Sequence, residues 1–251
     1  MNGFETHGIR HSSVSQINTW EANPALWVAE KLLGKKRSAS PAMWRGIAVE
    51  NAVVDCVTET RDLPDAINAA LEFYDDKITL ADEKSEKERA AIDPMTRLAV
   101  DELKAFGKPD FSVAGEQEKV EVICSGDGWK LPIIGYLDLV YPEHGLVVDL
   151  KTTFRLPSSM TVGHRRQRCL YDRCTGNQSV KFLYVTPKKF GWLEDGDVDE
   201  ELAAIKAHLN RLERFLSISD DPEYLASIVP VDPSHFYWGD CIDMRKEVFG
   251  L

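Results

Sequence analysis

The sequence lacks a long apolar run, and this absence argues against a membrane protein. No stretch approaches the roughly 18 consecutive apolar residues that a membrane-spanning helix requires, and residues 1–13 are mainly polar. We therefore expect a cytoplasmic protein with no membrane partner. With 251 residues, of which 43% are hydrophobic, the chain is long enough to bury a sizeable core.

Cysteine is also scarce, and its spacing is not that of a metal site. The chain has five cysteines, an odd number, and no Cys-x-x-Cys pair occurs among Cys56, Cys124, Cys169, Cys174 and Cys241. Disulfide frameworks usually use an even number of cysteines, and simple zinc sites usually use closely spaced pairs. The pattern therefore favours reduced thiols.

Basic residues are outnumbered, with 30 Lys and Arg against 41 Asp and Glu, for a formal net charge of −11. Such a balance ordinarily argues against a nucleic-acid partner. The charge is uneven, however, because the segment from Lys151 to Lys189 contains nine basic residues and one acid, or +8. A basic surface there would attract phosphates by releasing counterions. The alternative, a solvated basic helix face, stays open.

Hydrophobic periodicity predicts a helical first part, a β-rich middle and a helical end, which is an α/β fold. Helical patterns precede Pro109, and the last of them covers residues 84–106. After Pro109 the hydrophobic pattern becomes that of β-strands. The later segments are strands at 111–123, 129–140 and 146–152, a helix at 158–174, strands at 181–185 and 190–193, and a helix at 198–216.

The most informative feature is a predicted β-hairpin. Apolar runs at 135–140 and 146–151 flank the polar, glycine-containing turn Pro142–Gly145. If the hairpin is symmetric, Asp138 lies opposite Asp149, with Cα atoms roughly 4.5–5.5 Å apart. Because side chains alternate along a strand, Val147, Asp149 and Lys151 share one face. The other face carries Leu146, Val148 and Leu150. One face is therefore predicted to be core, and the other a site.

Two opposed carboxylates need compensation by a cation or by a raised pKa. Lys151 supplies one positive charge, and a hard divalent ion such as Mg²⁺ or Mn²⁺ would supply the rest. The alternative is an exposed pair of aspartates, neutralised by the lysine on a solvated sheet face. The residues alone leave both interpretations open.

Five short motifs occur in order between residues 13 and 171. They are Ser13–Ile17 with Trp20 and Asn23–Trp27, then Arg45–Glu50, Gly135–Asp138, Val148–Lys151 and Gln167–Tyr171. Together they resemble the PD-(D/E)XK nuclease superfamily, and more narrowly its RecB-like exonuclease branch. The resemblance implies a restriction-endonuclease-like core, with a central mixed β-sheet flanked by helices and an added N-terminal helical part. Residues 1–251 would form a single nuclease domain, with a mainly helical part at 13–107, a sheet-containing catalytic core at 108–193 and a C-terminal helical part at 194–251.

The resemblance also implies a set of catalytic residues. Glu50, Asp138, Asp149 and the backbone carbonyl of Leu150 would bind one or two Mg²⁺ or Mn²⁺ ions. Lys151 would orient or deprotonate the attacking water. Glu50 stands where the branch usually has a histidine, and the alternative for it is a solvated helix residue.

Many members of the branch hold an iron–sulfur cluster with four cysteines. Here Asn23 occupies the first of these positions, and only Cys241 lies near the carboxyl end. We therefore expect no iron–sulfur cluster.

Candidate DNA contacts lie on the helix that follows the hairpin. Gln167 and Tyr171 are four residues apart and share a face, so they would touch DNA phosphate or hold Lys151. The alternative is Tyr171 in the core, with Gln167 at its edge. Arg165, Arg166 and Arg168 would contact the DNA backbone.

The resulting hypothesis is a Mg²⁺- or Mn²⁺-dependent deoxyribonuclease. It would act as an exonuclease on single strands or duplex ends, in recombination, DNA repair or phage DNA processing. The alternative is a catalytically silent nuclease-like module that binds DNA or a protein. A recombination partner protein and a homo-oligomer are both compatible with the resemblance.

Overall fold

The computed structural model describes residues 2–79, 81–110, 120–126, 128–176, 178–239 and 241–251. The chain divides into two units. The helical unit contains Met1–Ser38, Ile123–Gly135 and Gly196–Leu251. The sheet unit contains Ala39–Val122 and Tyr136–Asp195.

In the helical unit, most of the helices begin at a residue whose side chain caps the first turn. Its elements are α1 (Gly3–Thr6), α2 (Val14–Ala22), α3 (Pro24–Lys31), α9 (Val198–Leu216), α10 (Pro222–Ile228), the short 3₁₀ helix η4 (Phe236–Trp238) and α11 (Ile242–Phe249). The Asn23 side chain accepts a hydrogen bond from the backbone N–H of Leu26 at 3.1 Å, and Pro24 follows it, which is a favourable start for α3. The Trp20 ring packs against Trp27 and Phe215, with ring centroids 5.6 and 5.1 Å away.

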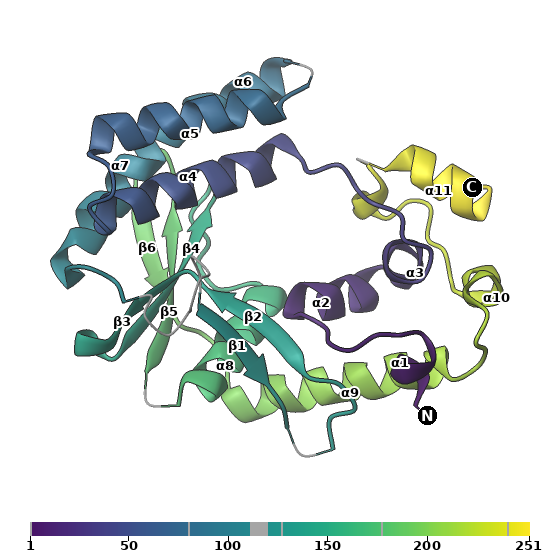
Figure 1. Ribbon diagram of the computed structural model, residues 1–251. Helices are drawn as coiled ribbons and strands as arrows, with labels where there is room; N and C mark the ends of the chain where they lie inside the picture. The colour runs from purple at the N-terminus through teal and green to yellow at the C-terminus, as the bar shows by residue number, and fades with distance from the viewer. Residues whose placement is uncertain (1, 80, 111–119, 127, 177, 240) are drawn as a thin grey trace. The chain divides into compact units, whose positions relative to one another are not determined.

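The sheet unit is organised around a four-stranded mixed sheet in the order β3-β4-β5-β6 (Figure 1). The strands are β3 (Leu139–Tyr141), β4 (Leu146–Thr152), β5 (Ser179–Val185) and β6 (Phe190–Leu193). The β3/β4 and β5/β6 pairs are antiparallel, and β4/β5 is parallel. A parallel pair needs a crossover connection, and α8 (Val162–Thr175) supplies it.

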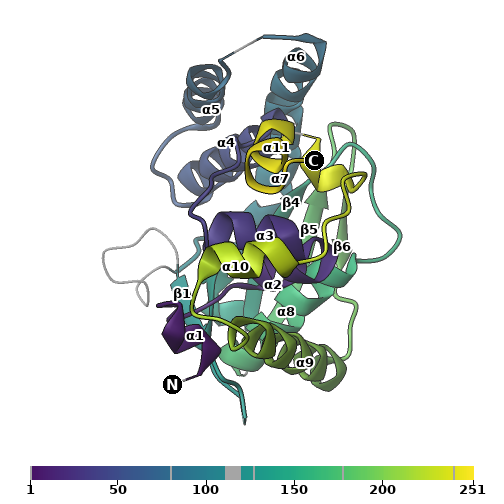
Figure 2. The same ribbon diagram turned by 90° about the vertical axis from the view of Figure 1, so that its right-hand side faces the viewer.

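Helices cover both faces of this sheet. On one side lie α4 (Pro41–Val57), α5 (Leu63–Lys77), α6 (Glu83–Ala90) and α7 (Ile92–Leu103), and α8 lies on the other (Figures 1 and 2). Leu146, Val148 and Leu150 of β4 pack into one core with α4, α5 and α7. This core also includes Val49, Met95 and Leu183. The predicted α/β class, with a central mixed sheet flanked by helices, is therefore confirmed.

The predicted helix over 84–106 is divided in two. Its first part, α6, ends at Ala90, and α7 begins at Ile92 and leads into the 3₁₀ helix η1 (Lys104–Phe106). Pro94 explains the division, because proline has no N–H to continue the helical ladder but fits within a first turn.

The predicted strand over 129–140 is divided as well. It becomes β2 (Ile133–Leu137) and β3, with Asp138 between them, and β2 pairs with β1 (Val120–Cys124) in a separate two-stranded sheet. Residues 111–119 of the preceding predicted strand lie outside the described residues. The bounds predicted for 146–152, 190–193 and 198–216 agree with β4, β6 and α9.

The expectation of reduced thiols is only partly right. Cys56, Cys169 and Cys241 are free thiols, whereas Cys124 and Cys174 are disulfide-bonded. The odd count of cysteines therefore did not exclude a disulfide. In the part of the chain that the structure describes, no helix has both the length and the apolar character needed to cross a membrane.

Two methionines of the sheet unit test the position of the core. Met95 is fully buried against β4 and its neighbours, whereas Met43 on α4 is 57% exposed. We expect Met95→Ala to lower the free energy of unfolding by about 2–5 kcal/mol, because it leaves a cavity. Met43→Ala should change it by less than about 0.5 kcal/mol. Urea denaturation measures both, and equal losses would contradict the proposed core.

Candidate functional site

The β3/β4 hairpin has the predicted register. Its turn is a short 3₁₀ helix, η3 (Pro142–His144), followed by Gly145 with φ of 56°, a left-handed conformation that favours glycine. The paired positions are Leu139 with Val148, Val140 with Val147 and Tyr141 with Leu146. Continuing this register by one residue places Asp138 opposite Asp149.

Both aspartates are buried, which excludes the solvated sheet face considered above. Asp149 is 1% exposed, and Asp138 is 8% exposed. The break between β2 and β3 places Asp138 outside the strand ladder, where its Oδ2 accepts a hydrogen bond from the backbone N–H of Leu150 at 3.0 Å. The side chain of Asp138 is thereby fixed to the backbone that follows Asp149.

The two carboxylate oxygens of Asp149 have different surroundings. Oδ2 accepts a hydrogen bond from Nε2 of Gln167 at 2.8 Å, and the same Nε2 lies 3.1 Å from the hydroxyl of Tyr171. Oδ1 forms an ion pair with Nζ of Lys151, but it accepts no hydrogen bond of good geometry from the described residues. A buried oxygen of this kind retains capacity for a further cationic partner.

The charged groups around Asp149 shift one another's pKa values. Burial raises the pKa of Asp149; Lys151 lowers it, and the carboxylates of Asp138 and Glu50 raise it further, so the net shift is upward. Burial would lower the pKa of Lys151, but Asp149 and Asp138 outweigh it and raise that pKa. Glu50 on α4 is therefore close enough for its charge to reach Asp149. The charges of Lys151, Asp138 and Glu50 thus all lie within electrostatic reach of Asp149.

Of the predicted DNA contacts, Tyr171, Arg166 and Arg168 are buried, whereas Gln167 and Arg165 are partly exposed. Gln167 holds Asp149 rather than Lys151, and Tyr171 is buried beside it, as in the alternative that placed the tyrosine in the core. Arg166 and Arg168 are also buried, and Nε of Arg168 donates to the carbonyl oxygen of Asp195 at 3.1 Å. Arg165 is only partly buried, so of the three arginines it is the best placed to reach a phosphate.

A comparison with known families identifies the chain. A family model of the PD-(D/E)XK nuclease superfamily matches residues 11–217, which is most of the sequence. The chain belongs to the PD-(D/E)XK nuclease superfamily. Its mixed sheet with flanking helices is the restriction-endonuclease-like core expected of that superfamily, whose members generally hydrolyse nucleic acids.

None of the curated proteins matches this chain. Among solved structures, "Crystal structure of SSO0001" matches with 13% sequence identity and a TM-score of 0.34. The match covers 75% of this chain and 84% of the other.

PD-(D/E)XK nucleases typically use divalent metal ions, and the donor chemistry here fits such an ion. Glu50, Asp138 and Asp149 offer only hard carboxylate oxygens, which Mg²⁺ and Mn²⁺ prefer. Oδ1 of Asp149 is buried without a hydrogen bond of good geometry. Over the described ranges, however, no three Asp, Glu, His or Cys side chains already form a cluster that could hold a metal ion.

Three aromatic side chains of the site were missed by the sequence analysis. Nζ of Lys151 lies 5.1 Å from the ring centroid of Phe182, and Nδ1 of His164 lies 2.6 Å from the hydroxyl of Tyr184. In the parallel β4/β5 register, Phe182 and Tyr184 pair with Asp149 and Lys151, so they share the polar face of the sheet. His164 precedes Gln167 by three residues, and this helical spacing was the available signal.

These charge effects predict that two variants shift the pKa of Asp149 in opposite directions. In metal-free buffer, Asp138→Asn should lower the pKa of Asp149, because a neighbouring negative charge is removed. Lys151→Met should raise it, because the compensating cation is lost. ¹³C NMR titration of the Asp149 carboxyl measures both shifts. The exposed Asp101, which is ion-paired with Lys104, serves as the control, and Asp101→Asn should leave the titration of Asp149 unchanged. Shifts of the same sign in the first two variants would contradict this arrangement.

His164 predicts a pH dependence of stability. Burial and the nearby Lys151 lower the pKa of His164 to about 4, below the value of about 6.5 expected in the unfolded chain. Between these two values the unfolded state binds more protons, so stability falls as the pH drops from about 7 towards 4. His164→Asn should reduce this fall, as measured by urea denaturation at pH 7 and pH 5. His11→Asn, at an exposed position, should follow the wild-type curve, and so would His164→Asn if the interpretation were wrong.

Proposed function

We propose that this PD-(D/E)XK protein is a Mg²⁺- or Mn²⁺-dependent deoxyribonuclease of the RecB-like branch. It acts as an exonuclease on single strands or duplex ends, in recombination, DNA repair or phage DNA processing, and residues 1–251 serve as one nuclease domain. One observation carries the proposal. Asp149 is a buried carboxylate with Lys151 on one oxygen and Gln167 on the other, and its charge is coupled to those of Asp138 and Glu50.

Burial of this charge supports a functional role. A buried carboxylate is expensive unless it is paired and hydrogen-bonded. Here Asp149 has one cation, one amide donor and two neighbouring carboxylates that raise its pKa. An apolar residue on this central strand would avoid that conflict. The polar cluster therefore fits a site that binds a cation better than it fits a device for stability.

A divalent ion would be held by Glu50, Asp138, Asp149 and the backbone carbonyl of Leu150. When bound, it would supply Lewis acidity to the attacking water and neutralise charge on the phosphate. The remaining chemistry belongs to the chain. Gln167 keeps the Asp149 carboxylate oriented through its bond to Oδ2.

Lys151 acts as a cation in this scheme. Its raised pKa keeps Nζ protonated beside Asp149, so its N–H groups orient the attacking water and oppose the negative charge that develops on the phosphate. The Lys151 side chain as a whole is 24% exposed. This role is favoured over deprotonation of the water, the other role that the sequence suggested.

Of the three arginines on α8 that were predicted to contact DNA, the proposal keeps one. Arg165 on α8 contacts the phosphate backbone without reading sequence. Arg166 and Arg168 are both buried, which argues against direct contact with DNA and reduces the basic surface expected from the segment between Lys151 and Lys189. The proposal therefore relies on metal and lysine at the scissile phosphate more than on a broad basic surface.

Two variants test the assignment. Lys151→Ala and Asp138→Asn should each lower the rate of DNA cleavage by at least about 100-fold, because the first removes the cation beside the reacting phosphate and the second removes a carboxylate that would hold the metal ion. The measurement uses end-labelled linear and circular DNA with Mn²⁺ and then with Mg²⁺, and a chelator should stop the reaction. An exonuclease should shorten the linear DNA and leave the circular DNA intact.

An exposed pair on α7 and η1 provides the matched controls. Nζ of Lys104 lies 3.9 Å from Oδ1 of Asp101, on the protein surface. Lys104→Ala and Asp101→Asn should cleave DNA at the wild-type rate. Near-normal cleavage by Lys151→Ala or Asp138→Asn would refute the catalytic assignment. Binding of DNA by the wild type without any metal-dependent product would favour the catalytically silent module.

A further inference from the structure

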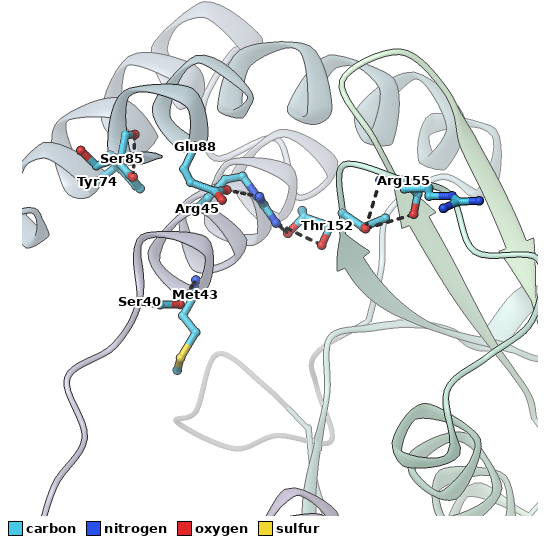
Figure 3. Close-up of polar contacts among 9 residues, drawn as sticks. Ser40, Met43, Arg45, Tyr74, Ser85, Glu88, Thr152 and Arg155 are labelled. Carbon is cyan, nitrogen blue, oxygen red and sulfur yellow. Dashed lines mark hydrogen bonds and ion pairs between the residues drawn. The ribbon is translucent and has the colours of Figure 1, made fainter. Parts of the chain in front are cut away.

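Arg45 is a buried residue that connects three elements of the sheet unit. It lies on α4, is 4% exposed, and forms an ion pair through Nη1 with Glu88 on α6. Its Nη2 donates to both the carbonyl oxygen and the Oγ1 of Thr152, each at 3.1 Å. Figure 3 shows the guanidinium extended between Glu88 and Thr152. The ring centroid of Phe154 lies 5.0 Å from its Cζ.

The Thr152 end of this network adjoins the site. Thr152 is the last residue of β4 and directly follows Lys151. On the other side, Gly46 follows Arg45, and a Cβ built on it would lie 3.4 Å from Oγ1 of Thr152. Gly46 and Glu50 are four residues apart and therefore share a face of α4. The helix face that touches the end of β4 is thus the face that carries Glu50.

Stability alone is a poor explanation for this network. Burial lowers the pKa of Arg45 even though Glu88 acts to raise it, so the pair does not fully compensate the loss of water around the charge. Nε of Arg45 is buried and has no hydrogen-bond partner among the described residues. Buried ion pairs are often no more stable than apolar residues of similar volume. What the planar guanidinium does provide is a rigid fork that fixes several acceptors at once.

We propose that Arg45 is a positioning residue of the active site. Through Thr152 it fixes the end of β4, and with it Lys151, relative to the face of α4 that carries Glu50. Arg45 acts through its neighbours and does not touch the substrate. This inference rests on the proposed nuclease function, because Lys151 and Glu50 are the groups that it positions.

Two substitutions separate positioning from stability. Arg45→Lys keeps a cation for Glu88 but loses the fork that reaches Thr152. Glu88→Gln removes the buried negative charge but keeps an oxygen acceptor and leaves the bonds from Arg45 to Thr152. We expect Arg45→Lys to lower kcat for DNA cleavage by about 10- to 100-fold with KM changed by less than about 2-fold, since small misplacements at a reacting centre have effects of this size. Glu88→Gln should retain kcat within about 2-fold, although it is the less stable of the two.

Hydrogen exchange provides a readout that does not depend on activity. The N–H of Leu150 donates to Oδ2 of Asp138 at 3.0 Å, and the N–H of Thr153 donates to the carbonyl oxygen of Val185 at 2.9 Å. Arg45→Lys should accelerate exchange at these two amides by about 10-fold or more relative to the core amide of Leu183, which reports on global opening. Glu88→Gln should accelerate all three by a similar factor.

The outcomes distinguish the two proposals. If both variants lose kcat equally and their exchange rises uniformly, Arg45 has only a structural role and the inference is overturned. If the wild type cleaves no DNA with Mg²⁺ or Mn²⁺, the proposed function fails. In that case, local acceleration in Arg45→Lys still supports positioning of the β4 end, and its absence overturns it.

Discussion

The buried negative charge of Asp149 is the constraint on which the rest of the sheet unit depends. β4 pairs with β3 on one side and with β5 on the other, and helices cover both faces of the sheet, so Asp149 has little access to water. Lys151 and Gln167 compensate its charge in part, and Asp138 and Glu50 oppose that compensation. A superfamily whose members typically bind divalent ions provides the chemical reason for such an arrangement.

The two faces of β4 have separate tasks. Val148 and Leu150 pack into the core with α4, α5 and α7, which secures the strand. Asp149 and Lys151 point to the other face, where α8 contributes Gln167 and β5 contributes Phe182. Because side chains alternate along a strand, one four-residue segment serves both tasks: Val148 and Leu150 pack in the core, and Asp149 and Lys151 lie in the candidate site. A shift of register by one residue would exchange the two sets.

A second charge, that of Arg45, is buried at the end of β4, and it too is only partly compensated by its neighbours. Arg45 is paired with Glu88 and donates to Thr152, but one of its N–H groups has no partner among the described residues. Among the described residues, two ion pairs in or beside β4, Lys151–Asp149 and Arg45–Glu88, thus each include a buried polar atom without a hydrogen bond of good geometry. Geometry that is fixed at the expense of stability is typical of functional sites.

The sequence by itself determined the hairpin. Its turn residues and alternating apolar pattern were enough to place Asp138 opposite Asp149 and to put Lys151 on the same face, because these relations are local. Only the tertiary structure decided that Asp149, Arg166 and Arg168 are buried, that the strand breaks at Asp138, and that Arg45 meets Glu88, 43 residues away in the chain. Burial and long-range pairing depend on which elements pack together, and no local pattern of residues encodes that packing.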